Sequence, residues 1–199
     1  MPVGEEGCTC ADLFDSAPYR TVIADAQGGV RYWPQLVGQA QAERWFTALR
    51  DGIEWKTLQR PMYERIVDVP RLLAHFELAA LPPDSPLAEM LARVRATVPG
   101  AYTHVGLNFY RDGRDSVAMH HDKLHSLVPG EPIALVSLGD TRRMNLRAKA
   151  GGRACGLDLA PGSLLAMSHA SQLTHEHGIP KTARPVGPRM SVVFRARPA

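Results

Sequence analysis

Apolar residues recur at helical spacing in two segments of the first half of this chain. In the first segment, Leu36 to Leu49, they fall among good helix formers, and Asp51-Gly52 follows as a stop signal. In the second, residues 87–94, a serine cap and a proline in the first turn come before the apolar positions, and Pro99-Gly100 ends the run. The pattern predicts two helices before residue 100.

After residue 100 the pattern changes to short alternating or continuous apolar runs, separated by turn dipeptides that contain glycine. These runs predict six strands: His104–Tyr110, Val117–His121, Ile133–Leu138, Met144–Arg147, Ser163–Met167 and Met190–Arg195. So many short strands in one half of a chain favour a β-sandwich or barrel, with the two helices packed on one outer face. We therefore expect a mainly β fold with flanking helices.

The composition indicates one globular domain. Of the 199 residues, 45% are hydrophobic and 22% are charged, which excludes intrinsic disorder and supplies enough apolar surface for a core without disulfide support. We expect a loose leader over residues 1–18 and a single domain over residues 19–199. Within that domain, residues 19–100 carry the helices and residues 101–199 carry the sheets.

No apolar run approaches the roughly 18 residues of a membrane span, and the N-terminus has neither a basic start nor an apolar signal segment. We therefore expect a cytoplasmic protein that contacts no membrane and whose cysteines (Cys8, Cys10 and Cys155) are reduced. The formal net charge is +3, and the excess of basic side chains lies after residue 100. That half suits an anionic partner, although a solvated face explains a small surplus equally well.

The segment around His120 and Asp122 carries the first candidate chemistry. Because the side chains of a strand alternate between its faces, this pair is expected on one side. A distant second histidine would complete the set of two histidines and one carboxylate that holds Fe(II) and leaves three coordination positions open. The candidates for it are His169, His175 and His177. In a chain with eight histidines, such a pair can also arise by chance or contain a structural histidine.

The last predicted strand places Arg189, Ser191 and Arg195 on one face. Arginine binds a carboxylate through a two-pronged contact and keeps its charge, so this face suits an anion. An edge strand with its polar side in water is the alternative. Asn108 and Tyr110 add an amide and a phenol on the first strand. A dicarboxylate bound next to a metal ion would use these groups.

The order of these motifs resembles the AlkB family of Fe(II)- and 2-oxoglutarate-dependent dioxygenases. The segments that carry the resemblance are N-x-Y-x-D-G at 108–113, H-x-D at 120–122, P-I-x-x-x-S-L-G at 132–139, G-S-L-L-x-M at 162–167, H-x-I-P-K at 177–181 and R-P-x-x-P-R, followed by F-R, within 184–195. The resemblance covers about residues 60–197 and is strongest after residue 104. So many segments in one order argue against coincidence.

The resemblance implies a double-stranded β-helix, or jelly roll, with the metal between its two sheets. It implies that His120, Asp122 and His177 hold Fe(II) and form the catalytic centre. The remaining histidines near the motifs, His121, His125, His169 and His175, are then not ligands. In the implied arrangement 2-oxoglutarate and O2 are the co-substrates. The far carboxylate of 2-oxoglutarate pairs with Arg189, helped by Asn108, Tyr110 and Ser191, and Arg195 lies near its other carboxylate.

The implied substrate is an alkylated base in DNA or RNA, extruded from its stack, and the implied products are succinate, CO2 and formaldehyde. Phe76, in the segment that resembles the substrate lid, could stack on this base, and so could Trp55 or Tyr63, although a single aromatic residue can equally belong to the core. The candidates for phosphate contacts, which solvated surface explains as well, are Lys123, Arg142, Arg143, Lys149 and Arg153.

Two departures from the family pattern concern the substrate. Leu124 stands where DNA-repair members usually have an acidic residue that helps to bind the damaged base, which predicts a preference for neutral or bulkier lesions. Glu77 replaces a glycine of the lid, which predicts a shortened or remodelled lid. The same oxidation of tRNA, a protein or a small molecule therefore stays open. A metal-binding jelly roll without turnover is the non-enzymatic alternative, and the anion-binding face argues against it. We expect a monomer.

Overall fold

The computed structural model describes residues 18–62 and 65–198. Most of the expected leader, with Cys8 and Cys10, lies outside these ranges, and so does Tyr63. Within the described ranges, no helix is long and apolar enough to cross a membrane.

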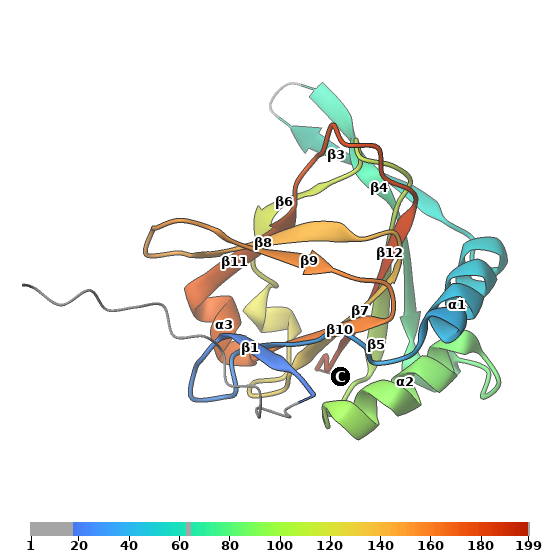
Figure 1. Ribbon diagram of the computed structural model, residues 1–199, viewed down its shortest axis with the longest axis horizontal. Coiled ribbons are helices and arrows are strands. Elements are labelled where there is room, and N and C mark those ends of the chain that lie inside the picture. The colour runs from blue at the N-terminus through green and yellow to red at the C-terminus, as the bar shows by residue number, and fades with distance from the viewer. Residues whose placement is uncertain (1–17, 63–64, 199) are drawn as a thin grey trace, which may run out of the picture.

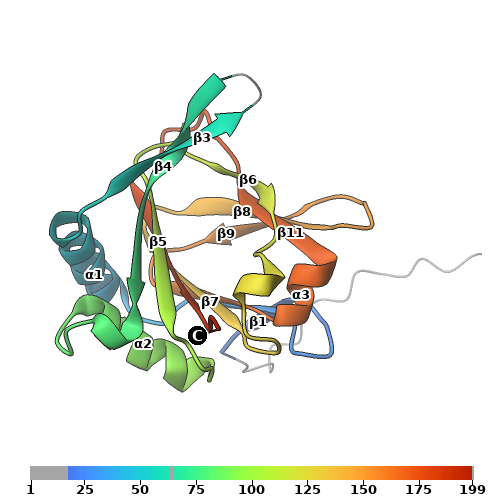
Figure 2. The same cartoon turned by 180° about the vertical axis from the view of Figure 1, so that it is seen from behind.

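The described chain forms an eight-stranded and a four-stranded antiparallel sheet (Figure 1). The larger sheet has the order β1-β2-β10-β7-β12-β5-β4-β3 and the smaller β6-β11-β8-β9. The strands of the larger sheet are β1 (Arg20–Ile23), β2 (Val30–Trp33), β3 (Lys56–Met62), β4 (Arg65–Glu77), β5 (His104–Tyr110), β7 (Ile133–Gly139), β10 (Ser163–Met167) and β12 (Arg189–Arg195). Those of the smaller sheet are β6 (Val117–His120), β8 (Arg142–Ala148), β9 (Cys155–Leu159) and β11 (His175–Ile179). The smaller sheet lies across from the larger one (Figure 2), as the expected jelly roll requires.

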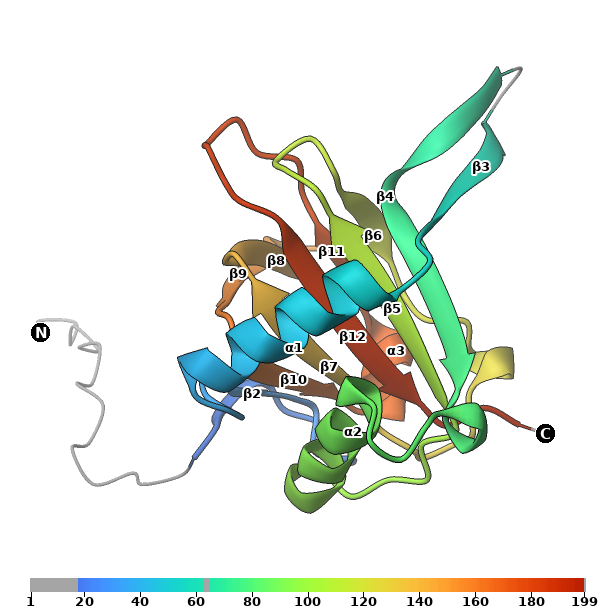
Figure 3. The same ribbon diagram turned by 90° about the vertical axis from the view of Figure 1, so that its right-hand side faces the viewer.

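Two helices, α1 (Gln39–Gly52) and α2 (Pro86–Thr97), cover the outer face of the larger sheet (Figure 3). The serine cap that the sequence indicates is present, because Oγ of Ser85 accepts a hydrogen bond from the amide of Ala88 at 3.2 Å. The remaining helical segments are α3 (His169–Thr174) and the 3-10 turns η1 (Leu78–Ala80) and η2 (Leu124–Ser126). The prediction of two helices on one outer face is confirmed.

The larger sheet separates two hydrophobic clusters. Met190, Val192 and Phe194 of β12 belong to the cluster under the helices, whereas Val193 belongs to the cluster between the two sheets. This alternation is the one that the sequence of β12 predicts. Because β7 is buried on both faces, its sequence is an almost continuous apolar run. The face of β12 that carries Arg189, Ser191 and Arg195 therefore points between the sheets and not into water.

The strands that the sequence analysis did not predict are β1 to β4, β9 and β11. In β4, Pro70 interrupts the pattern, and a proline within an apolar run argues against a central strand. β4 nevertheless pairs with β5 from Leu72 to Glu77, beyond the proline. β11 has the sequence HEHGI, whose polar residues hide its alternation. β3 and the first part of β4 extend beyond the other strands as a hairpin (Figure 3).

Candidate active site

A cavity of about 1160 Å³ opens between the two sheets. Its walls come from β4, β5 and β12 of the larger sheet and from β6 and β11 of the smaller one. The lining side chains include His120, His177, Asp122, Arg189 and Arg195, so the cavity brings together residues that are far apart in the sequence.

Two histidine rings meet on the smaller sheet. His177 of β11 lies opposite His120 of β6 in the antiparallel register, and their ring centres are 4.5 Å apart. Nδ1 of His120 donates to the carbonyl oxygen of Ala118 at 2.9 Å, which leaves Nε2 with a free lone pair. Burial, helped by the neighbouring imidazole of His120, lowers the pKa of His177 to about 4. His177 is therefore neutral at physiological pH, the form in which imidazole binds a metal.

The carboxylate of Asp122 faces this pair and also binds an arginine of the larger sheet. Nε of Arg195 donates to Oδ2 at 2.9 Å and Nη2 donates to Oδ1 at 3.1 Å. Burial raises the pKa of Asp122, but Arg195 and the two imidazoles outweigh it and hold the pKa below its ordinary value. Among the residues that the structure describes, no three His, Cys, Asp or Glu side chains are arranged to hold a metal ion.

Arg189 is a fully buried cation at the other end of the site. Its Nε donates to Oγ of Ser137 at 3.1 Å, and its guanidinium lies 5.1 Å from the centre of the Tyr110 ring. Nη1 and Nη2 have no hydrogen-bond partner in the described part of the chain. Burial lowers the pKa of Arg189 to about 10, so it stays charged at neutral pH. Two buried donors without partners are costly, and a carboxylate would satisfy both.

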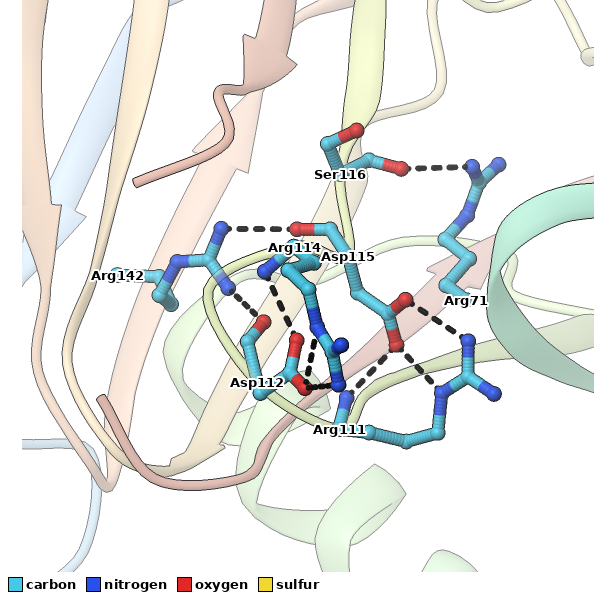
Figure 4. A network of polar contacts seen from close by, with 7 residues as sticks. All are labelled: Arg71, Arg111, Asp112, Arg114, Asp115, Ser116 and Arg142. Atoms are coloured by element: carbon cyan, nitrogen blue, oxygen red, sulfur yellow. Dashed lines mark hydrogen bonds and ion pairs between the residues drawn. The ribbon is translucent and has the colours of Figure 1, made fainter. Parts of the chain in front are cut away.

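Asn108 and Ser191 lie side by side in the register of β5 and β12. Nδ2 of Asn108 donates to Oγ of Ser191 at 3.3 Å, and Oδ1 accepts from Nε of Arg71 at 2.7 Å. Nη1 of Arg71 also donates to the carbonyl oxygen of Ser116 at 3.2 Å (Figure 4). Arg71 therefore fixes the orientation of the Asn108 amide and ties β4 to the loop after β5.

Comparison with known proteins accounts for this combination of groups. The sequence profile of the 2OG-Fe(II) oxygenase superfamily matches residues 29–195. The chain belongs to this superfamily. Human DNA oxidative demethylase ALKBH2 is 32% identical over 183 residues, which cover 80% of this chain and 70% of that protein. Mouse alpha-ketoglutarate-dependent dioxygenase alkB homolog 3 is 32% identical over 113 residues, or 52% of this chain and 40% of its own length.

The solved structure of OsALKBH1 has the same fold, with a TM-score of 0.65, 16% sequence identity and coverage of 90% of this chain and 100% of that one. These findings confirm the resemblance to the AlkB family, and the chain is an AlkB-like dioxygenase. The superfamily uses Fe(II), 2-oxoglutarate and O2. The residues described above fit these groups by their chemistry, since two imidazoles and a carboxylate line one cavity with an unpaired buried arginine, although the described side chains as they stand are not arranged around a metal position.

In this 2-oxoglutarate oxygenase, Arg142 does not contact phosphate, and the prediction that it does is wrong. Its side chain is buried, with 3% exposed, and it donates to the carbonyl oxygens of Asp112 (2.9 Å), Asp115 (2.9 Å) and Pro180 (2.7 Å). Figure 4 shows the first two of these bonds. Asp115, itself buried, also binds the backbone and side chain of Arg111. Arg142 therefore fixes the loop between β5 and β6.

Leu124 is not among the cavity-lining residues of the described chain, and its contact with the substrate base stays a prediction. The chain turns into η2 directly after Lys123, and this turn takes Leu124 off the strand that carries His120. The carboxylates among the described cavity-lining residues are those of Glu54 and Asp122. Neither Glu77 nor Glu176 lines the cavity.

Some of the other predicted substrate residues lie at the cavity and some do not. Phe76 borders the cavity but packs against the core cluster under the helices, and Trp55 packs on Phe109 with ring centres 5.2 Å apart. Lys123 is exposed at the cavity wall, where a phosphate contact stays a prediction. Arg143 is exposed, pairs with Asp158 at 3.0 Å and does not line the cavity.

The sequence analysis did not identify Ser137 and Arg71 as site residues. Ser137 is the one polar residue in the apolar run Ile133–Leu138, and a lone hydroxyl in a fully buried strand is a usable signal. Arg71 lies in a strand that was not predicted, so nothing in the local pattern pointed its side chain toward Asn108.

Proposed function

We propose that this protein oxidatively demethylates alkylated bases in DNA, with release of succinate, CO2 and formaldehyde. The observation that carries the proposal is a single cavity in which the unpaired guanidinium of Arg189 accompanies the His120 and His177 pair. The relatives named DNA oxidative demethylase support the choice of nucleic acid as substrate.

In this proposal His120, Asp122 and His177 hold iron. When bound, iron and 2-oxoglutarate supply the oxidising centre that hydroxylates an N-methyl group, which then leaves as formaldehyde. Arg195 binds both oxygens of Asp122 and keeps the carboxylate ionised. The lone pair on Nε2 of His120 is oriented by the bond from Nδ1 to Ala118, which is a common arrangement around metal-binding histidines.

In this proposal Arg189 binds the far carboxylate of 2-oxoglutarate. Ser137 holds its Nε, so the two terminal nitrogens are directed at the ligand. The Tyr110 ring packs below the guanidinium, and Asn108 and Ser191 present an amide and a hydroxyl on the same face of the sheet. A buried two-pronged contact excludes water and selects a carboxylate over a neutral group.

A second candidate is the same oxidation of a neutral modified base, which DNA or RNA can carry. The charges of the cavity wall support this candidate. The wall is mostly basic, with Lys56, Arg71, Lys123 and Arg197, and its carboxylate Asp122 is already bound by Arg195. With Glu54 as the remaining carboxylate among the described lining residues, a cationic methylated base gains little from the wall. A neutral modified base, in DNA or in RNA, is not repelled by these basic side chains and therefore suits the cavity better.

The test is a panel of substrates. The protein, loaded with Fe(II) and 2-oxoglutarate, is incubated with DNA and RNA oligomers of one sequence that carry either a cationic or a neutral N-methylated base, and succinate and formaldehyde are measured. We expect formaldehyde in proportion to the methylated base in DNA. Formaldehyde from the neutral methylated base alone, in DNA or in RNA, would favour the second candidate. Succinate above background with no formaldehyde from any oligomer would contradict a nucleic-acid substrate.

A further inference from the structure

A second arginine of the cavity has a buried nitrogen without a partner. Arg197, two residues beyond β12, lines the cavity, and its Nε is buried with no hydrogen-bond partner among the described residues. Its backbone is fixed, because its amide donates to Oγ1 of Thr103 at 2.9 Å. A buried donor that is left without an acceptor is energetically costly. The position of Arg197 therefore indicates an acceptor that binds there.

The cavity face of the larger sheet continues from Arg195 toward two histidines. Arg195 lies opposite His104 in the β12–β5 register, and Gly106 lies opposite His75 in the β5–β4 register. The rings of His75 and His104 stack with centres 5.4 Å apart and planes 20° apart. A Cβ at Gly106 would lie 3.6 Å from Nη1 of Arg195 and 3.9 Å from Nδ1 of His75. The glycine therefore leaves a hollow between the guanidinium and the imidazole.

Negative charge is scarce at this end of the cavity. Both oxygens of Asp122 are taken by Arg195, and Glu77 is exposed at the end of β4. Burial, followed by the charges of Arg197, His104 and Arg195, holds the pKa of His75 below its ordinary value, and Glu77 only partly opposes them. Four basic groups, those of Arg195, Arg197, His75 and His104, thus lie together, and the carboxylates beside them are Asp122, which is bound to Arg195, and the exposed Glu77, which lies opposite His104 in the β5–β4 register.

The anion at Arg197 is a different one from the anion at Arg189. These two residues are eight positions apart, which corresponds to roughly 26 Å along an extended chain. A 2-oxoglutarate molecule that is held by Arg189, with its other carboxylate near Arg195, does not extend to Arg197.

We propose that Arg197, His75 and His104 form a second anion site, which binds a phosphate ester of the nucleotide that carries the modified base. The inference rests on the proposed function for the identity of the ligand. A base that enters the cavity carries its own phosphates on the neighbouring atoms of the sugar, so a basic site at the cavity wall can hold the strand while the base reaches the histidine pair. The guanidinium suits phosphate because it donates two parallel hydrogen bonds.

The first test compares a nucleoside with its phosphates. The protein with Fe(II) and 2-oxoglutarate is titrated anaerobically in a calorimeter with 3-methylthymidine and with its 5′- and 3′-monophosphates. We expect at least one monophosphate to bind about tenfold or more tightly than the nucleoside. Arg197→Gln should bring this ratio close to one, and Arg197→Lys should give an intermediate ratio. Arg93→Gln is the matched control, because Arg93 is exposed on α2, on the opposite face of the sheet.

The second test uses a methylated single-stranded oligomer and measures its dissociation constant as a function of salt. Loss of one phosphate contact lowers the slope of log K against log salt by about 0.7. We expect this change in Arg197→Gln and not in Arg93→Gln, with circular dichroism confirming that both variants are folded. If Arg197→Gln does not fold, the test uses Arg197→Lys, which keeps the charge. An intermediate ratio of monophosphate affinity to nucleoside affinity then supports the site, and the wild-type ratio overturns it.

The inference is overturned if the wild type binds nucleoside and monophosphates equally, or if Arg197→Gln keeps both the affinity ratio and the salt slope. The proposed function fails in a different way, by absence of formaldehyde from every oligomer of the substrate panel. A monophosphate preference that depends on Arg197 would support the anion site even then, for a free nucleotide as the ligand.

Discussion

At the scale of single residues, the environment of a side chain decides its role more than its type does. Arg189, Arg142 and Arg143 are three arginines of the same half of the chain. Arg189 is buried with two unpaired nitrogens, Arg142 is buried with all its bonds to backbone carbonyls, and Arg143 is exposed in an ion pair. The sequence distinguished Arg189 through its strand pattern and family motif. It could not separate Arg142 from Arg143, because neighbours in a strand differ only in which face becomes buried.

A substitution of Arg189 tests whether this residue binds 2-oxoglutarate. We expect Arg189→Lys to weaken 2-oxoglutarate binding about tenfold to hundredfold, since a lysine is a point charge and a buried charge-assisted contact contributes roughly 1.5–3 kcal/mol. Calorimetric titration of the metal-loaded protein with 2-oxoglutarate measures the constant. Arg143→Lys is the matched control, because Arg143 is exposed and does not line the cavity. An unchanged constant in Arg189→Lys would place the co-substrate elsewhere.

The roles of Arg142 and Arg143 predict opposite outcomes in stability. We expect Arg142→Ala to lower the free energy of unfolding by about 3 kcal/mol or more, because three carbonyl oxygens lose a buried donor. Arg143→Ala, which removes an exposed ion pair, should cost at most about 1 kcal/mol. Urea denaturation measures both. Equal stability of the two variants would mean that Arg142 does not fix the loop between β5 and β6.

At the scale of elements, the sequence predicted those whose periodicity is unbroken and whose ends carry a turn or cap signal. α2 begins at Pro86 after the Ser85 cap, and β5 and β10 have the predicted bounds. β4 and β11 were missed for different reasons. Pro70 interrupts β4, and β11 has the polar His177 at an inward-facing position because this residue belongs to the site. A functional strand violates the apolar pattern by which strands are recognised, so β11 was missed and His177 was identified only through its family motif.

At the scale of the whole molecule, the site joins the two sheets. His120 and His177 belong to the smaller sheet, Arg189 and Arg195 belong to the larger one, and the ion pair between Arg195 and Asp122 connects them. The sequence could not predict that the two sheets meet at the site, because the packing of the complete fold determines which strands face one another. It predicted the faces of the strands, and the jelly roll then brought these faces together.

A ligand that binds both sheets should stabilise the whole fold. We expect metal and 2-oxoglutarate, each at about 100 times its dissociation constant, to raise the free energy of unfolding by roughly 2.7 kcal/mol per site. Thermal unfolding with and without the ligands measures this increase, and a chelator should reverse the part due to the metal. If 2-oxoglutarate left the unfolding midpoint unchanged at saturation, it would not bind the native protein.

The ligand assignment at the histidine pair is the central claim of this account, and metal binding by matched histidine variants tests it most directly. Fe(II) content is measured after anaerobic dialysis for the wild type, His177→Ala and His175→Ala. His175 lies two residues away on β11 and does not line the cavity. We predict one Fe(II) per chain in the wild type and in His175→Ala, and almost none in His177→Ala. Stoichiometric iron in His177→Ala, or its loss in His175→Ala, would contradict the assignment.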